Sequence, residues 1–334
     1  MSEFTSIHIF NPETDYALAV GNKIYNPPAK IVEFRRNNAL IPASFAKRND
    51  WIALIDRDAS ISDPVLSDAV SRKGIKVVHV SDLAKEMASR PDLCFLLRPW
   101  GWNFSLVSLL QKAGIPDSLI LALPRLESLR ALSHRRTAIL FQRRLQTLLP
   151  GISVPIAREF ADPDSAIDFL NRQGDAYFKL PWSSSGRGVI HAADFPSPKI
   201  KEWIAGGIRR QGSVIGENAF RRAADFATEW WIENGSASFL GLSFFRTSPE
   251  GRYLGNLIDS QDIISQKIAA ASPLWSQDII DAQKTVIDEI IAPQYSGPLG
   301  IDMLADVNGA VNPCVEINLR QTMGLAAILQ YQNP

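Results

Sequence analysis

The chain has 334 residues, of which 46% are hydrophobic, so it is long enough for two or three domains with large cores. Its 35 lysines and arginines balance 35 aspartates and glutamates, and this zero net charge gives no support for bulk-charge binding of nucleic acid or a membrane surface. Cys94 and Cys314 both lie in apolar runs, which predicts small buried side chains and neither a disulfide nor a zinc site. The first residues lack a basic region followed by an apolar one, and no apolar run is long enough to span a bilayer. We therefore expect a cytoplasmic protein without a signal peptide.

Residues 1–123 alternate short apolar segments with helical patterns. The expected strands are 6–10, 51–55, 75–80 and 93–97, and the expected helices include 63–73 and 81–90. This alternation is typical of a parallel sheet with helices on both faces. In such sheets, ligands bind at the carboxyl ends of the strands.

Two of these strands run into unusual segments. The first is followed by Asn11 and a long stretch expected to be irregular, and the fourth by Arg98, Trp100 and Trp102. Two indoles and a guanidinium beside Gly101 suit the wall of a substrate pocket, and the alternative is a structural turn capped by packed indoles. No Gly-x-Gly-x-x-Gly follows any of these strands, which argues against a dinucleotide site.

A basic helix is expected within 124–150, with Ser133 as its N-cap and Arg135 and Arg136 just after it. The usual meaning of such a basic run is a solvated helix face.

Gly206-Gly207, further along the chain, is expected to be a local break in the structure.

An apolar strand after a helix near 163–173 ends at Lys179 and leads into a Ser/Gly loop that reaches Gly188. Small residues let backbone N–H groups approach phosphate oxygens, and a lysine at the strand end adds a positive charge. The loop is not a Walker A motif, because no Gly-Lys-Ser/Thr follows it. A flexible hairpin turn is the alternative.

Strands are next expected at 214–220, 225–232, 236–245 and 252–257, and helices at about 260–271, at 278–292 and from 323. A hairpin lies between the last two helices, with apolar runs on both sides of Asn308-Gly309. Strand alternation puts Glu316 and Asn318 on one face, and pairing brings Asp302 opposite them. Two carboxylates and an amide oxygen form a hard site that suits Mg²⁺ with phosphates completing its shell. The alternative, solvated acids at a sheet edge, does not suit Glu316 within an apolar run.

Taken together, the order of these features resembles the ATP-grasp superfamily: a basic residue on a linking helix, a strand lysine, a Gly/Ser loop, an acidic hinge strand and a terminal Asp…Glu-x-Asn. The resemblance implies a chain of α/β and α+β class. A Rossmann-like domain would cover 1–123. An ATP-grasp fold of two α+β subdomains, at about 124–212 and 213–334, would follow it.

The resemblance also implies roles for single residues. Lys179 would contact adenine or the α-phosphate, the Ser/Gly loop would cover the β- and γ-phosphates, and Glu217 to Phe220 would form the hinge that reads the adenine edge. Asp225 would bind the ribose, with Glu229 as an alternative. The implied ATP-binding set is Arg135 or Arg136, Lys179, Ser184, Ser185, Gly186, Arg187, Gly188, Glu217, Phe220 and Asp225.

For the chemistry itself, Asp302, Glu316 and Asn318 would hold Mg²⁺ (or Mn²⁺). Arg320 would contact the transferring phosphate or a substrate carboxylate, and Arg246 and Asn256 would line the same cleft. The expected substrate side consists of Asn11, Arg98, Trp100 and Trp102.

The superfamily's common reaction is ligation, in which ATP phosphorylates a carboxylate and an amine or a thiol attacks the acyl phosphate. The resemblance therefore implies an ATP-dependent ligase with small-molecule substrates and without a nucleic-acid or membrane partner, and it allows a homodimer. Two alternatives are an ATP-grasp kinase that phosphorylates a hydroxyl and a non-catalytic ATP-binding sensor. A sensor would be expected to have an eroded metal triad, whereas all three residues are present here.

Overall fold

The structure, a computed structural model, describes residues 4–61, 63–152, 154–183, 188–193, 195–248 and 253–333. The chain divides into two compact units. Unit 1 consists of Met1–Arg130, Arg320–Thr322 and Ala326–Pro334, and unit 2 consists of Ala131–Leu319 and Met323–Leu325. The first unit boundary follows Arg130, and the last 15 residues (320–334) are divided between the two units.

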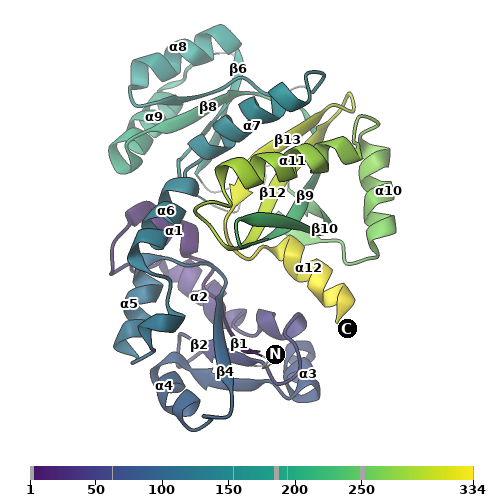
Figure 1. Ribbon diagram of the computed structural model, residues 1–334. Coiled ribbons are helices and arrows are strands. Elements are labelled where there is room, and N and C mark those ends of the chain that lie inside the picture. Colours follow the sequence, from purple (N-terminus) through teal and green to yellow (C-terminus); the bar gives the residue numbers. More distant parts are fainter. Residues whose placement is uncertain are drawn as a thin grey trace. The chain divides into compact units, whose positions relative to one another are not determined.

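Unit 1 is built on a four-stranded parallel sheet in the order β3-β2-β1-β4. Its strands are β1 (Phe4–Ile9), β2 (Trp51–Leu54), β3 (Lys76–His79) and β4 (Cys94–Pro99). The helical segments of unit 1 are α1 (Thr14–Val20), α2 (Ala29–Asn37), η1 (Ile41–Ser44), α3 (Pro64–Lys73), α4 (Val80–Ala88), α5 (Phe104–Lys112), η2 (Asp117–Leu119) and α6 (Leu123–Leu132). This confirms the predicted parallel sheet (Figure 1).

Alternation along β2 explains why helices cover both faces of this sheet. Trp51 and Ala53 belong to the core formed with α4 and α5, whereas Ile52 and Leu54 belong to the core formed with η1 and α3. A strand buried on both faces appears in the sequence as a continuous apolar run.

Three sequence predictions are wrong in unit 1 and at its border. The long irregular stretch after β1 contains the helix α1, which ends at Gly21 in a left-handed conformation. Cys94 is exposed, because it begins β4, which lies at the edge of the sheet. Ser133 does not cap a helix: α7 (Arg136–Leu148) has Arg135 at its N-cap position and no side-chain cap hydrogen bond.

Unit 2 contains two antiparallel sheets. The four-stranded sheet has the order β5-β8-β6-β7, and the five-stranded sheet has the order β11-β10-β9-β12-β13. The strands are β5 (Ala157–Phe160), β6 (Asp175–Lys179), β7 (Val189–Ala193), β8 (Val214–Asn218), β9 (Arg222–Glu233), β10 (Ser236–Thr247), β11 (Tyr253–Asn256), β12 (Gly297–Asp306) and β13 (Val311–Asn318). Besides α7, the helices that begin in unit 2 are α8 (Pro163–Gln173), α9 (Pro198–Gln211), α10 (Gln261–Ala271), α11 (Gln277–Ile290) and α12 (Met323–Gln332).

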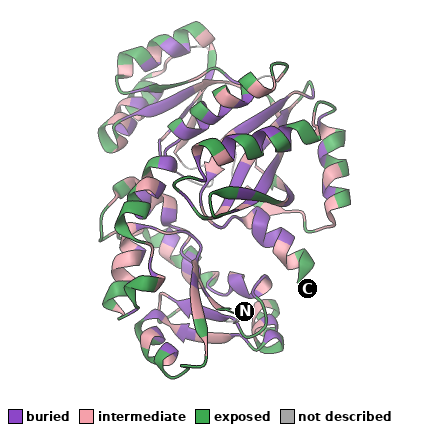
Figure 2. Cartoon of the chain, viewed as in Figure 1, coloured by how far each residue is buried: buried purple, intermediate pink, exposed green. Residues whose placement is uncertain are grey.

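The predicted break at Gly206-Gly207 is wrong, because both glycines lie inside α9 and are buried. A Cβ on Gly207 would come within 2.8 Å of Val214 and 2.9 Å of Leu180, so the missing side chain lets α9 pack closely against the sheet. In Figure 2, the central strands of the sheets are mostly buried, and the outer faces of the helices are exposed. Among the described residues, no helix is both long and apolar enough to cross a bilayer.

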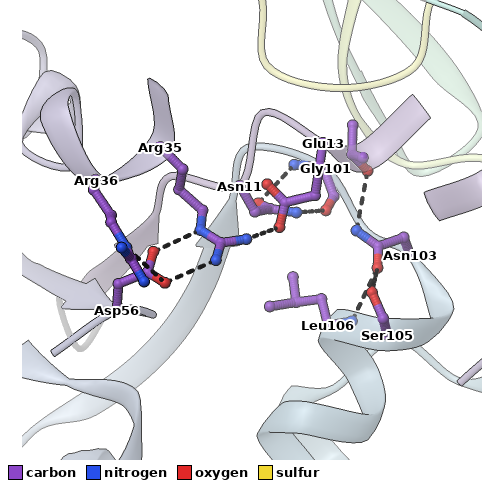
Figure 3. A network of polar contacts seen from close by, with 10 residues as sticks. Asn11, Glu13, Arg35, Arg36, Asp56, Gly101, Asn103, Ser105 and Leu106 are labelled. Atoms are coloured by element: carbon purple, nitrogen blue, oxygen red, sulfur yellow. Dashed lines mark hydrogen bonds and ion pairs between the residues drawn. The ribbon is translucent and has the colours of Figure 1, made fainter. Parts of the chain in front are cut away.

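An ion-pair cluster at the carboxyl ends of β1 and β2 ties α2 to the sheet of unit 1 (Figure 3). The guanidinium of Arg35 donates to both carboxylate oxygens of Asp56, at 2.7 and 2.9 Å, and to Glu13 Oε1 at 2.6 Å. The side chains of Arg35 and Asp56 are only 10% and 12% exposed. Loss of one partner therefore leaves a buried charge poorly compensated.

Asp56→Asn is expected to lower the free energy of unfolding by about 2 kcal/mol at neutral pH. Burial would raise the pKa of Asp56, but hydrogen bonds and charge from Arg35, together with Arg36, outweigh it and hold the pKa below its ordinary 3.8. A depressed carboxylate pKa gives stability that is present above the unfolded-state pKa and is lost as pH falls through the folded-state pKa. Urea denaturation at a series of pH values measures the free energy of unfolding of both proteins. The difference in this free energy between parent and variant should be constant down to about pH 5 and should become smaller below about pH 4. Asp58→Asn, at a side chain that is 65% exposed, is the control. A difference in the free energy of unfolding that does not become smaller below about pH 4 would contradict the role assigned to Asp56.

Candidate functional site

The predicted hairpin of β12 and β13 is present and pairs Asp302 directly with Glu316 and Gly300 with Asn318. Directly paired residues of antiparallel strands project on the same side, as do residues i and i+2 of one strand. Asp302, Glu316 and Asn318 therefore share one face, as the sequence predicts.

The opposite face of the same sheet forms the core. Thr228 of β9 donates to Gln283 of α11, and the Gln283 amide also contacts Met303 of β12. Helices α10 and α11 cover this face (Figure 1). The side chains that the sheet buries on this face include Phe226, Trp230 and Ile301. The sheet is thus amphipathic, with its polar residues gathered on the face turned away from these helices.

Two further acids of β9 lie on the polar face. The register pairs Asp302 with Ala227, which places Asp225 and Glu229, two residues away on each side, on the same face. Burial raises the pKa of Asp225 despite a 2.5 Å hydrogen bond from Thr247 and the nearby Arg222.

Glu229, the alternative for the ribose, is only 1% exposed and accepts a 3.1 Å hydrogen bond from Ser243. A Cβ on Gly324, in the first turn of α12, would lie 2.0 Å from Glu229 Oε1. The helix N-terminus thus covers this carboxylate, and Asp225 is the more accessible acid of the two.

Lys179 ends β6 and forms an ion pair with Glu217 of β8. The register pairs Tyr177 with Glu217, so the lysine, two residues further, lies diagonally across the strands on the same face. The alternate residue Phe178 belongs to the core under α8 and α9. Lys179 and Glu217 therefore occupy the face of the four-stranded sheet that these two helices leave uncovered.

Arg135 joins the two sheets of unit 2. Its guanidinium donates to the carbonyl of Leu180 at 3.0 Å, to Ser183 Oγ at 3.1 Å and to Glu316 Oε1 at 2.9 Å. Arg136 instead pairs with Glu159 and contacts His134. The sequence left these two arginines undecided, and the structure brings only Arg135 to the hairpin acids.

The buried thiol of Cys314 locates the charges around it. Burial raises its pKa, and among the nearby charges Asp302, Glu217 and Glu316 raise it further while Lys179 lowers it. The geometry agrees with this, because Arg135 links the carbonyl of Leu180, the residue after Lys179, to Glu316, which pairs with Asp302.

The predicted phosphate loop lies mostly outside the described residues, since these do not include Ser184, Ser185, Gly186 and Arg187. At its end, Gly188 has a left-handed φ of +73°, and its carbonyl accepts from the backbone N–H of Leu180. Ahead of β9, Phe220 follows Glu217 in the segment that leaves β8.

The structure does not bring Arg246 to the other predicted site residues. Asn256 pairs with Phe245, which in turn pairs with Asp225, so Asn256 shares the polar face. Arg246, the next residue on β10, alternates to the other side of the strand and is exposed.

Arg320 lies beyond the end of β13, so strand alternation does not fix its direction. It belongs to unit 1, where its Nε donates to Asp15 Oδ2 at 2.9 Å and a second nitrogen donates to the carbonyl of Gln321.

The predicted substrate residues Asn11, Trp100 and Trp102 hold a turn of unit 1. The Asn11 amide bonds both the carbonyl and the N–H of Gly101. The Trp100 indole is 6% exposed and packs edge-on against Phe10. Trp102 is partly buried against the core of β1, α4 and α5, and Arg98 is partly buried in β4.

The residues present fit a Mg²⁺ ion. Asp302, Glu316 and Asn318 offer hard oxygen ligands from facing positions on two paired strands. Within the ranges that the structure describes, no three His, Cys, Asp or Glu side chains gather as a complete metal site. Mg²⁺ is usually held by one or two protein carboxylates together with phosphates and water, and Asp302 and Glu316 would supply the two carboxylates.

Lys179→Ala is expected to weaken ATP binding by about 2 kcal/mol, the size of a charge-assisted hydrogen bond to a phosphate. Isothermal calorimetry with ATP measures this, with Lys201→Ala, at an exposed lysine of α9, as the matched control. Circular dichroism checks the fold, because the variant leaves Glu217 without its lysine partner. Equal ATP affinity in a folded Lys179→Ala variant would remove Lys179 from the site.

Comparison with solved structures identifies the fold. Biotin carboxylase from Campylobacter jejuni, in a complex with β,γ-ATP, is 12% identical over 99% of this chain and 72% of its own, with a TM-score of 0.55. The biotin carboxylase domain of 2-oxoglutarate carboxylase from Hydrogenobacter thermophilus, with MgADP and bicarbonate, is 11% identical over 99% and 70%, with a TM-score of 0.55. N5-carboxyaminoimidazole synthetase from Staphylococcus aureus, complexed with ADP, is 11% identical over 100% and 79%, with a TM-score of 0.51.

This chain has the ATP-grasp fold, with a parallel sheet followed by two antiparallel sheets, as the resemblance implies. No model of a known protein family matches the sequence, and neither does any curated protein.

Proposed function

We propose that this protein is an ATP-dependent ligase. ATP would phosphorylate a substrate carboxylate, giving ADP and an acyl phosphate, and an amine or a thiol would then displace phosphate to form an amide or a thioester. The observation that carries the proposal is that Arg135 joins the end of β6, where Lys179 lies, to Glu316, which pairs with Asp302 on the second sheet of unit 2. The solved structures of the same fold include complexes with ADP, MgADP and β,γ-ATP, which supports a nucleotide at this site.

Each residue then has a distinct task at the nucleotide. Lys179 and Arg135 neutralise phosphate charge, and the segment from Glu217 to Phe220 reads the adenine edge. Asp225, with its raised pKa and its Thr247 hydrogen bond, accepts a ribose hydroxyl. Phosphoryl transfer needs positioning and charge neutralisation more than covalent help from the protein, which agrees with this set of residues.

Asp302, Glu316 and Asn318 would hold Mg²⁺, which supplies positive charge against the β- and γ-phosphates when it is bound. Arg135 already donates to Glu316, so it orients this carboxylate and stands beside the place of the phosphates. Arg320, Arg98 and Trp102 are proposed for the acceptor side, whereas Asn11 and Trp100 are buried and hold the turn at Gly101.

A screen of metabolite pools for ADP release, with mass spectrometry of the product, tests the reaction class. A ligase is expected to release ADP only when an acid and an amine or thiol are both present. A phosphorylated product that forms and persists without an amine or thiol would indicate the kinase alternative. Tight ATP binding without turnover in any pool would indicate the sensor.

A further inference from the structure

Glu13 occupies the position in unit 1 where the strand order reverses. The chain passes from β1 outward to β2 and β3 and returns to β4 on the other side of β1. In open α/β sheets, ligands bind outside the carboxyl ends of the strands at this switch point. Glu13 follows the carboxyl end of β1, and Asp56 follows that of β2.

One oxygen of the Glu13 carboxylate is buried without a hydrogen-bond donor. The residue is 6% exposed, and its Oε1 accepts a 2.6 Å bond from Arg35, whereas Oε2 has no hydrogen-bond partner among the described residues. Arg35 Nη1 donates to Oε1 and not to Oε2, and the other two guanidinium nitrogens bind both oxygens of Asp56 (Figure 3). A buried acceptor without a donor is costly and is rare in folded proteins.

The buried part of this cluster also lacks one positive charge. Glu13 and Asp56 face a single buried cation, Arg35, because the Arg36 side chain is 40% exposed and also pairs with the exposed Asp58. Burial raises the pKa of Glu13 despite Arg35, while Arg35 and Arg36 lower that of Asp56 despite burial. Glu13 is therefore the carboxylate with the weaker share of Arg35, through one hydrogen bond against two for Asp56.

Two further features belong to the segments that follow β1 and β4. Burial, together with the charges of Glu13 and Tyr16, raises the pKa of Tyr25 to about 12, so its phenol stays neutral near the carboxylate. The turn after β4 is tied to the segment after β1, because the Asn11 side chain donates a hydrogen bond to the carbonyl of Gly101. The two segments are also in close contact, since a Cβ on Gly101 would lie 2.6 Å from Thr14.

We propose that Glu13 forms a subsite for the primary ammonium group of a small-molecule ligand. An ammonium group supplies both the missing charge and the missing donor for Oε2. An anion would be repelled by Glu13, and a divalent metal needs more oxygen ligands than this one free atom offers. The assignment of the ligand as the enzyme's substrate rests on the proposed function, whereas the binding of the ammonium group does not.

Saturation-transfer NMR with propylammonium chloride, and with sodium propionate at equal concentration, tests the subsite without ATP or turnover. Propylammonium is expected to bind the parent protein, and propionate is not. Glu13→Gln keeps an acceptor for Arg35 and removes the charge, so it should weaken propylammonium binding about tenfold or more. Glu33→Gln, at an exposed residue of α2, removes the same charge elsewhere and should bind like the parent.

Absence of propylammonium binding to the parent, equal binding by Glu13→Gln, or a preference for propionate would overturn the proposal. If Glu13→Gln does not fold, the parent protein is titrated instead and the ¹³C chemical shift of the Glu13 side-chain carboxyl is followed. The proposal requires that this shift changes with propylammonium and does not change with propionate. A subsite that binds ammonium in a protein that never releases ADP would refute the ligase proposal alone.

Discussion

Glu316→Gln is expected to lower ATP turnover about 10³-fold at moderate Mg²⁺, about 4 kcal/mol of transition-state stabilisation. The change removes one negative charge from the proposed metal site. It keeps the shape of the side chain and an oxygen that can accept from Arg135, which now donates to Glu316 at 2.9 Å. The main loss is therefore Mg²⁺ affinity, and a higher Mg²⁺ concentration should restore part of the activity.

The measurement is ADP release against Mg²⁺ concentration for the parent and the variant, with Glu202→Gln as a charge-matched control at an exposed residue of α9. The control should follow the parent curve at every concentration. If Glu316→Gln also follows it, the metal assignment is wrong and the sensor alternative gains support.

Arg320→Lys is expected to lower kcat about 10²-fold, about 3 kcal/mol, with the KM for ATP little changed. Arg320 is held in place by Asp15 at 2.9 Å and by the carbonyl of Gln321. A planar guanidinium can bind a phosphate or carboxylate through two nitrogens at once, which a lysine cannot do.

Steady-state kinetics separates kcat from KM, with Arg209→Lys, at an exposed arginine of α9, as the matched control. Asp15→Asn keeps the arginine and loosens its orientation, so it should cause a smaller fall in kcat. A rise in the KM for ATP with an unchanged kcat would place Arg320 in ATP binding and remove it from the chemical step.

The parts of the fold that the sequence predicted are those set by local periodicity. Alternation within β13 was enough to place Glu316 and Asn318 on one face, and the turn at Asn308-Gly309 was enough to bring Asp302 opposite. The parallel sheet of unit 1 followed from alternating strands and helices for the same reason.

The parts that it missed depend on contacts between distant residues. Arg135, and not Arg136, lies at the hairpin acids because it binds Leu180, Ser183 and Glu316. These three residues are distant from α7 in the sequence, so no local pattern could predict the contacts. The two glycines in α9 looked like a break, because glycine disfavours helices, yet close packing against Val214 selects glycine at the second position.

The polar cluster around Glu13 was missed for a different reason. Glu13, Arg35 and Asp56 are spread over 44 residues in segments that were read as a loop, an unassigned stretch and a strand end. One signal was present in the sequence: Glu13 is an acid in the segment after the first strand of a parallel sheet, and ligands bind at this end of such strands.

Calorimetric titration of ATP with and without Mg²⁺ tests the central claim most directly, because it needs no knowledge of the acceptor substrate. We expect the parent to bind ATP about tenfold or more tightly with Mg²⁺ than without it, and a folded Asp302→Asn/Glu316→Gln double variant to lose this difference while it still binds ATP through Lys179 and Arg135. A parent protein that binds no ATP, or a double variant with an undiminished Mg²⁺ effect, would contradict the account.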